Sequence, residues 1–253
     1  MKKIFNVFLV LLLFSVQTAS AQNISPEPPK DIVKGIIENQ ITVKNGSGIF
    51  IDDMKIQNYI SNIGMKILNA NKIDKRMAFV FHKKDAKIKG EPSLTRRQIV
   101  VYKDDIKFVA DDSELAAYLA REIAKCASSY DGMWNGFVSS AQIKLAPKKF
   151  ELYFDKRAVD YMVAAGYNPL ALITFINKSY EQKRFDKISN HNLTSKRLAN
   201  IYEYIYTKYP VFLADNEYIN NEAYQNFLLN SLENRKKLHE KIKTGSRERI
   251  NYE

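Results

Sequence analysis

Helical periodicity over the second half of the chain limits its fold more than any other feature. From Ser113 onward, apolar residues recur at the three- and four-residue spacing that places them on one face of a helix. Asp112 or Ser113 is the predicted N-cap of a first helix, whose buried stripe comprises Leu115, Ala116, Leu119, Ile123 and Ala124. Gly166 is a predicted C-terminal stop of a helix, and Pro169 is a predicted first-turn residue of the next helix. Further helices are predicted near residues 146–165, 169–182, 194–209 and 220–243.

The segment before residue 113 adds two helices and a small sheet. Asp31 is the predicted start of a short helix that ends before Asn45, and Asp53 caps a longer one, with an apolar face of Ile56, Tyr59, Ile60, Ile63, Ile67 and Leu68. Residues 77–82 and 98–102 are short, apolar and rich in valine and aromatic residues, which is typical of strands. Residues 86–94 are a weaker third candidate. We therefore predict an α+β fold, mainly helical, with a small antiparallel sheet.

The first 21 residues have the pattern of a signal peptide. Lys2 and Lys3 precede an apolar run over residues 4–16, and Ala19-Ser20-Ala21 is a small-x-small cleavage site before Gln22. The run is too short to span a bilayer, and no later segment approaches about 18 apolar residues. Because glutamine rather than cysteine follows the site, a lipoprotein anchor is not expected. We predict an exported protein, periplasmic or secreted, with no transmembrane segment after cleavage.

Three parts are expected in the exported chain. The proline-rich residues 22–30 form an extended lead-in, because proline fits neither a helix interior nor a central strand. Residues 31–215 form the main domain. Residues 216–253 form a C-terminal helix with a basic tail, whose simplest interpretation is a solvated helix end and whose alternative is a docking arm.

Composition excludes several classes of protein. Hydrophobic residues make up 45% of the chain and aromatic residues 12%, which is enough for a core and argues against disorder. Cys126 is the single cysteine, so no intramolecular disulfide is possible, and the three histidines are never four residues apart. The net charge of +11 would suggest nucleic acid in a cytosolic protein. For an exported one we expect no nucleic acid, and a solvated basic surface, an anionic envelope surface or an acidic partner stay open.

Three motifs in the middle of the chain resemble a peptidase signature. Residues 112–125 read D-S-E-L-A-A-Y-L-A-R-E-I-A-K, and residues 150–169 read F-E-L-Y-F-D-K-R-A-V-D-Y-M-V-A-A-G-Y-N-P. His191 and Arg197 follow. In order and spacing, over roughly residues 56–210, these resemble the M48 zinc metallopeptidases, with their E-L-A-x-x-L-A lead, H-E-x-x-H, E-A-D helix, A-G-Y-D/N-P and S-x-H-P motifs. The resemblance implies a zincin-like fold in which the 113–127 helix packs beside the 149–165 helix.

The departures from this pattern fall on the metal ligands. In the family, the two histidines of H-E-x-x-H and the glutamate of E-A-D hold zinc, and the corresponding positions here are Arg121, Lys125 and Tyr153. A protonated guanidinium or ammonium has no lone pair to donate, and a phenol alone is a weak ligand. We therefore predict that the chain holds no zinc and no other cofactor.

The resemblance gives roles to three further residues. Glu122 takes the position of the general base and Asp155 that of a residue that orients a zinc ligand. Without a metal, water beside Glu122 stays far from ionising at neutral pH. We expect Glu122 to pair with Lys125 and Asp155 with Arg121 or Lys125, so that an ion-pair cluster replaces the metal site. His191 matches a cleft position, but Asn192 replaces the proline that follows it in the family, which favours a surface or capping role.

The expected function follows from this loss. The resemblance implies a non-catalytic, M48-peptidase-like protein of the cell envelope that acts as a peptide-binding, chaperone-like or adaptor module, with a polypeptide or envelope protein as its partner. Pairing of an extended peptide with an edge strand does not require a metal. Two alternatives stay open: an active metalloendopeptidase with an atypical site, and a structural assembly protein that uses the basic tail.

Overall fold

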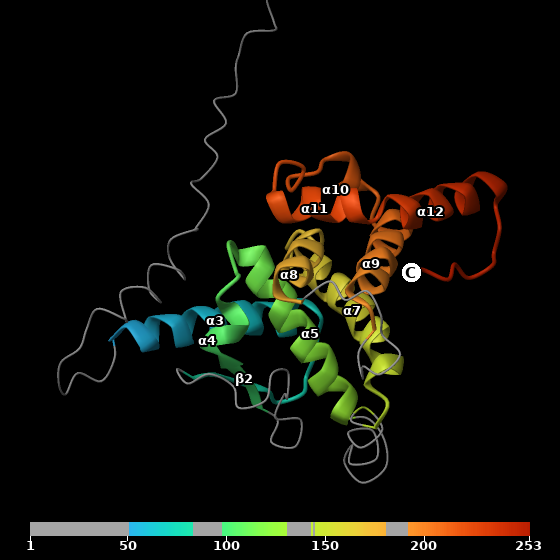
Figure 1. Cartoon of the computed structure of the whole chain (residues 1–253). Coiled ribbons are helices and arrows are strands. Elements are labelled where there is room, and N and C mark those ends of the chain that lie inside the picture. Colours follow the sequence, from blue (N-terminus) through green and yellow to red (C-terminus); the bar gives the residue numbers. More distant parts are fainter. Residues whose placement is uncertain (1–50, 83–97, 131–142, 144, 181–191) are drawn as a thin grey trace, which may run out of the picture.

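The computed structural model describes residues 51–82, 98–130, 143, 145–180 and 192–253 (Figure 1). This part of the chain is mostly helical with one two-stranded sheet, which confirms the predicted α+β class. The elements are α3 (Ile51–Ala70), β1 (Ala78–His82), β2 (Gln98–Tyr102), α4 (Lys103–Ile106), α5 (Asp112–Tyr130), α7 (Pro147–Ala164), α8 (Ala171–Ser179), α9 (Thr194–Lys208), α10 (Val211–Ala214), α11 (Glu222–Asn230) and α12 (Leu232–Thr244).

Helix α5 is the centre of the fold. It packs against α3, α7, α8 and β2, and every residue from Glu114 to Ala124 is buried. The predicted stripe of Leu115, Leu119 and Ile123 is fully buried. Alanines on the other faces let neighbouring helices approach closely. Because α5 is enclosed on all sides, its charged residues must find partners inside the protein.

Helix α3 covers one side of α5. Its face of Ile56, Ile60, Ile63 and Ile67 is at most 5% exposed, as the apolar periodicity predicts. The helix starts at Ile51 rather than after Asp53. The side chain of Gln57 on α3 bonds the sheet directly, since it donates to the Phe79 carbonyl and accepts from the Phe81 N–H.

The sheet corrects one prediction. Strands β1 and β2 pair in parallel, from Ala78 opposite Gln98 to His82 opposite Tyr102, so the predicted antiparallel sheet is wrong. Antiparallel neighbours can be joined by a tight turn, whereas parallel ones need a crossover of about a dozen residues or more. Residues 83–97, which join the strands, are long enough for that crossover.

The C-terminal part is two helices rather than one. The predicted helix over residues 220–243 is interrupted at Ser231, which ends α11 and precedes α12. Helix α11 packs on α8, and α12 packs on α9. The last residues then fold back from the end of α12 towards α9 (Figure 1). Tyr252 is 3% exposed, and its hydroxyl donates to Glu203 on α9. The end of the basic tail is therefore anchored.

Several predictions lie outside the described residues. These are the signal peptide and lead-in over 1–30, the short helix after Asp31, the candidate strand 86–94 and His191. Within the described ranges, none of the helices combines the length and apolarity needed to traverse a bilayer.

Gly64 tests the contact between α3 and β1. A Cβ atom at this position would overlap the Phe79 ring. We expect Gly64→Ala to lower the free energy of unfolding by about 1–3 kcal/mol through overpacking, although alanine gains about 1 kcal/mol in an open helix. Chemical denaturation measures the change. In a Phe79→Leu background the same substitution should be neutral or stabilising, and a stabilising effect with Phe79 present would contradict the packing.

Candidate functional site

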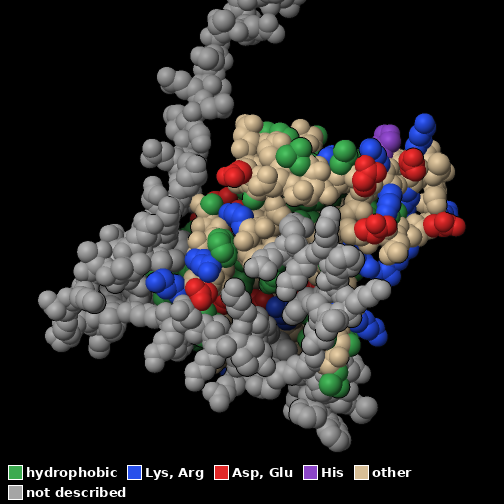
Figure 2. All heavy atoms as spheres, viewed as in Figure 1, with side chains coloured by type: hydrophobic (Ala, Val, Ile, Leu, Met, Phe, Trp, Pro, Cys, Tyr) green, Lys and Arg blue, Asp and Glu red, His purple; other side chains and the backbone are tan. Residues whose placement is uncertain are grey.

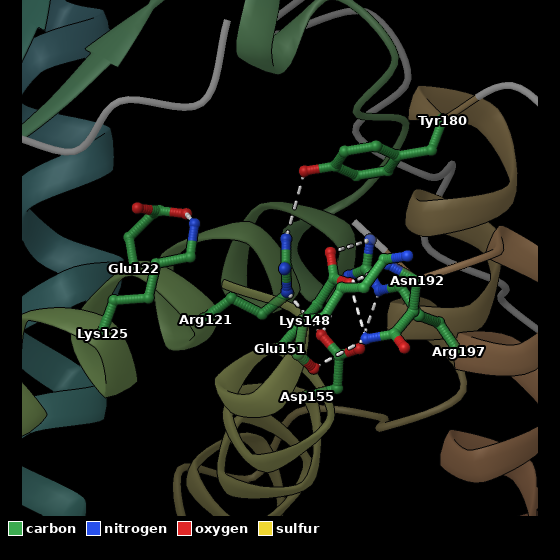
Figure 3. Close-up of polar contacts among 9 residues, drawn as sticks. All are labelled: Arg121, Glu122, Lys125, Lys148, Glu151, Asp155, Tyr180, Asn192 and Arg197. Carbon is green, nitrogen blue, oxygen red and sulfur yellow. Dashed lines mark hydrogen bonds and ion pairs between the residues drawn. The ribbon is translucent and has the colours of Figure 1, made fainter. Parts of the chain in front are cut away.

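Helices α5, α7 and α9 bring four charged side chains together in the interior. Helix α5 supplies Arg121, α7 supplies Glu151 and Asp155, and α9 supplies Arg197 (Figure 3). We call these four residues the ion-pair cluster. The packing of α5 beside α7, which the sequence predicts, places the first three, and α9 closes the cluster by packing on α7.

Asp155 is the hub of the cluster. It is 1% exposed, and both of its oxygens accept charge-assisted bonds. Arg121 Nε donates to Oδ1 at 2.7 Å, and Arg197 donates through Nε to Oδ2 and through Nη2 to Oδ1, each at 2.9 Å. The two bonds from Arg197 form the fork that a planar guanidinium makes with a carboxylate. The predicted pairing of Asp155 with Arg121 is therefore present.

Glu151 is the second carboxylate of the cluster, and the sequence analysis did not identify it. Its Oε1 lies 3.2 Å from Arg197 Nη1, and its Oε2 accepts from the backbone N–H of Asn192 at 2.8 Å and from the Asn192 side chain at 3.0 Å. A proline at position 192 could donate neither bond. The departure from the family pattern at Asn192 is thus part of how Glu151 is held.

Both guanidiniums are fully charged inside the protein. Burial disfavours the charge of Arg121 and Arg197, but Asp155 together with Glu151 and the other acceptors around them outweighs it, and the pKa of both side chains is raised. The cluster therefore holds two positive and two negative charges. Arg197 is among the largest fully buried side chains of the described part of the chain, and it is stable there because its donors meet acceptors.

Tyr180 lies at the edge of the cluster. Its hydroxyl accepts from Arg121 Nη1 at 3.2 Å, and the Arg197 guanidinium lies over its ring, 4.9 Å from the centroid (Figure 3). Burial opposes ionisation of this phenol, but the positive charges of Arg121 and Arg197 outweigh that and lower its pKa below the ordinary value of 10.0. The residue as a whole is 38% exposed, while its hydroxyl contacts the buried Arg121.

Glu122 and Lys125 form a separate pair. Lys125 Nζ donates to Glu122, as their spacing predicts. The side chain of Lys125 is 15% exposed and that of Glu122 is 8% exposed. In Figure 3 this pair points away from Asp155. The residue at the general-base position is therefore bound to a cation on its own helix.

Tyr153 does not join the cluster, which corrects the predicted convergence of positions 121, 125 and 153. Its side chain is 50% exposed and packs edge-on against Phe154, with ring centroids 5.7 Å apart. Glu151 and Asp155 are one helical turn apart and face inward together, whereas position 153 lies about 200° around the helix from 151. An acidic pair at i and i+4 on α7 was the signal that could have identified Glu151.

The donor set does not fit zinc. Two of the positions that hold the metal in the family carry cations, and each carboxylate of the cluster already binds a guanidinium. No three His, Cys, Asp or Glu side chains gather in a metal-binding arrangement within the described ranges. What these residues can do is to tie three helices together through neutralised charge.

The cost of breaking the cluster can be measured at Arg197. We expect Arg197→Met to lower the free energy of unfolding by about 3–5 kcal/mol, because it leaves Glu151 and Asp155 buried with too few donors. Lys208→Met is the matched control, since the Lys208 side chain is 47% exposed in its pair with Asp160, and pairs of this kind contribute about 0–1 kcal/mol. Equal losses in thermal or denaturant unfolding would refute a special role for the cluster.

Tyr180 should be identifiable by its titration. Absorbance at alkaline pH should show a step below the ordinary tyrosine pKa of about 10, and well before Tyr167 and Tyr224, whose pKa burial raises to about 12. Tyr180→Phe should remove that early step, and Arg121→Gln should move it to higher pH. Because the phenol has a lower pKa folded than unfolded, its contribution to stability grows as pH rises from its folded pKa towards about 10. An early step that persists in Tyr180→Phe would exclude this assignment.

Comparisons of the chain with protein-family models, with curated proteins and with solved structures give no match. The resemblance to the M48 peptidases thus rests on the motifs of the chain itself.

Proposed function

We propose that the chain is a non-catalytic, M48-peptidase-like protein of the cell envelope, exported through its N-terminal segment, which binds polypeptide as a chaperone-like or adaptor module. One observation carries the proposal. Two of the three positions to which the resemblance assigns the metal, Arg121 and Lys125, are engaged in ion pairs. Arg121 pairs with the supporting residue Asp155 between α5 and α7, and Lys125 pairs with Glu122 within α5.

The state of each carboxylate argues against peptide hydrolysis. A general base must be free to take a proton from water, and a metal must lower the pKa of that water. Asp155 and Glu151 each use both oxygens on donors from Arg197, Arg121 or Asn192. Glu122 binds Lys125. Each of these acids therefore has a structural partner in place of a reacting one.

Strand β2 offers a way to bind polypeptide without a metal. It pairs with β1 along one edge, and among the described strands none pairs with the other. Ile99 and Val101 anchor it in the core next to α5, while Gln98, Val100 and Tyr102 are half-buried. An extended peptide added to this edge would gain main-chain hydrogen bonds, and side-chain pockets would set its specificity.

A set of extended peptides tests the proposal on the purified chain. We expect no hydrolysis of an unfolded substrate with or without added zinc, and measurable binding of some apolar peptides by calorimetry or fluorescence anisotropy. Peptides methylated on every backbone nitrogen have no N–H to donate along either edge, so their binding by strand addition should be lost. Elemental analysis should find no stoichiometric zinc after dialysis.

Two results would contradict the proposal. About one zinc per chain together with peptide cleavage would favour a metalloendopeptidase with an atypical site. Equal binding of methylated and unmodified peptides would exclude strand addition at β2.

A further inference from the structure

The outer side of α7 carries a basic face with an aromatic residue in it. Lys149, Tyr153, Lys156 and Arg157 follow one another at i, i+4, i+7 and i+8, so they share one side of the helix, opposite Glu151 and Asp155. All four side chains are exposed. We call these four residues the α7 face.

The three cations of the α7 face rest on aromatic rings. Lys149 lies 5.8 Å from the Phe150 centroid, Lys156 lies 5.5 Å from Tyr204, and Arg157 lies 5.1 Å from Tyr161, whose hydroxyl accepts from Arg157 Nη2 at 3.3 Å. A cation–π contact orients the side chain but adds no negative charge. The positive charges are thus held in place without being neutralised.

The nearest carboxylate on this side of the molecule already has other partners. Asp160, the next acidic residue along α7, accepts from Lys208, Tyr204 and Tyr209. None of the three cations of the α7 face forms an ion pair with another residue that the structure describes. Figure 2 shows Lys and Arg side chains at the edge where α7 and α9 lie, while those over α12 are interspersed with acidic ones. Asp160 acts on Arg157 from one turn away, but it is shared with Lys208, so positive charge exceeds negative charge on this side of α7.

We propose that the α7 face docks on an anionic lipid bilayer. Lys149, Lys156 and Arg157 would contact lipid phosphates along about 12 Å of helix. The half-exposed Tyr153 lies among them, and a tyrosine placed there fits the boundary between headgroups and acyl chains. An acidic polypeptide would need only the three cations and would give no role to an exposed aromatic ring. The exposed aromatic ring, together with Leu145, 86% exposed just before α7, favours the lipid surface.

This docking is independent of the peptide site. It uses the side of α7 opposite the ion-pair cluster, and β2 packs on α5. The proposed contact is peripheral, since it uses exposed side chains on the outer side of α7. A chain bound this way keeps its interior unchanged, so loss of lipid binding and loss of peptide binding can be separated.

Vesicle co-sedimentation of the full chain without its first 21 residues tests the proposal. We expect binding to phosphatidylcholine vesicles that contain about 30% phosphatidylglycerol, and little binding to phosphatidylcholine alone. Each cation near such a surface is worth about a fivefold change in partitioning. The triple variant Lys149→Gln, Lys156→Gln, Arg157→Gln should therefore bind about 100-fold more weakly.

A second triple variant on α12 is the matched control. Lys236→Gln, Lys237→Gln and Lys243→Gln remove the same charge from α12, where Lys236 and Lys243 are exposed and Lys237 is half-buried, and should change binding by less than about fivefold. Circular dichroism checks that both variants are folded. If the α7 variant does not fold, the single reversal Lys149→Glu, with an expected loss of about 25-fold, replaces it.

Three outcomes would overturn the proposal. Equal losses in the two triple variants would assign binding to net charge or to the tail. Equal binding to neutral and anionic vesicles would exclude recognition of phosphate. Binding to soluble polyglutamate through the α7 face, with no binding to vesicles, would identify an acidic polypeptide as the partner class.

Discussion

The arrangement of the helices depends on the bonds that two arginines make to the carboxylate of Asp155. Asp155 lies on α7 and binds Arg121 from α5 and Arg197 from α9, so one buried group fixes three elements. Taking these charges out of water costs several kcal/mol for each ion, and only complete pairing offsets that cost. The three helices can therefore approach closely only when every donor meets its acceptor. Arg197 extends the same requirement to Glu151 and Asn192.

The ion-pair cluster also explains how acidic side chains are held inside a chain that resembles a metallopeptidase. Acidic side chains enclosed by helices need positive charge, and here Arg121 and Arg197 supply it. Glu122 receives its own cation from Lys125 one turn later. The proposal of a non-catalytic, peptide-binding protein follows from this use of the acids, while the sheet edge at β2 and the α7 face are surfaces that need no reacting group.

Local patterns predicted most of the helices, whereas long-range geometry did not follow from them. The buried faces of α3 and α5 repeat within one helix, and the Glu122–Lys125 pair spans a single turn, so sequence spacing was sufficient. The parallel sheet depends on the path between the strands, which no strand pattern encodes. Arg197 reaches Asp155 from 42 residues away. Tyr153 was aligned by counting along a motif, and helical phase instead turns Glu151 inward and Tyr153 outward.

The depth of the ion-pair cluster separates two kinds of electrostatics in one molecule. Mobile ions screen exposed charges over about 8 Å at physiological ionic strength, but they act weakly on pairs from which water is excluded. Arg197 and Asp155 are at most 2% exposed, whereas Lys149, Lys156 and Arg157 face solvent. Added sodium chloride should thus leave the ion-pair cluster between α5, α7 and α9 intact while it weakens every contact made by the surface cations. Ionic strength then becomes a means of detaching the protein from a charged surface without loosening its fold.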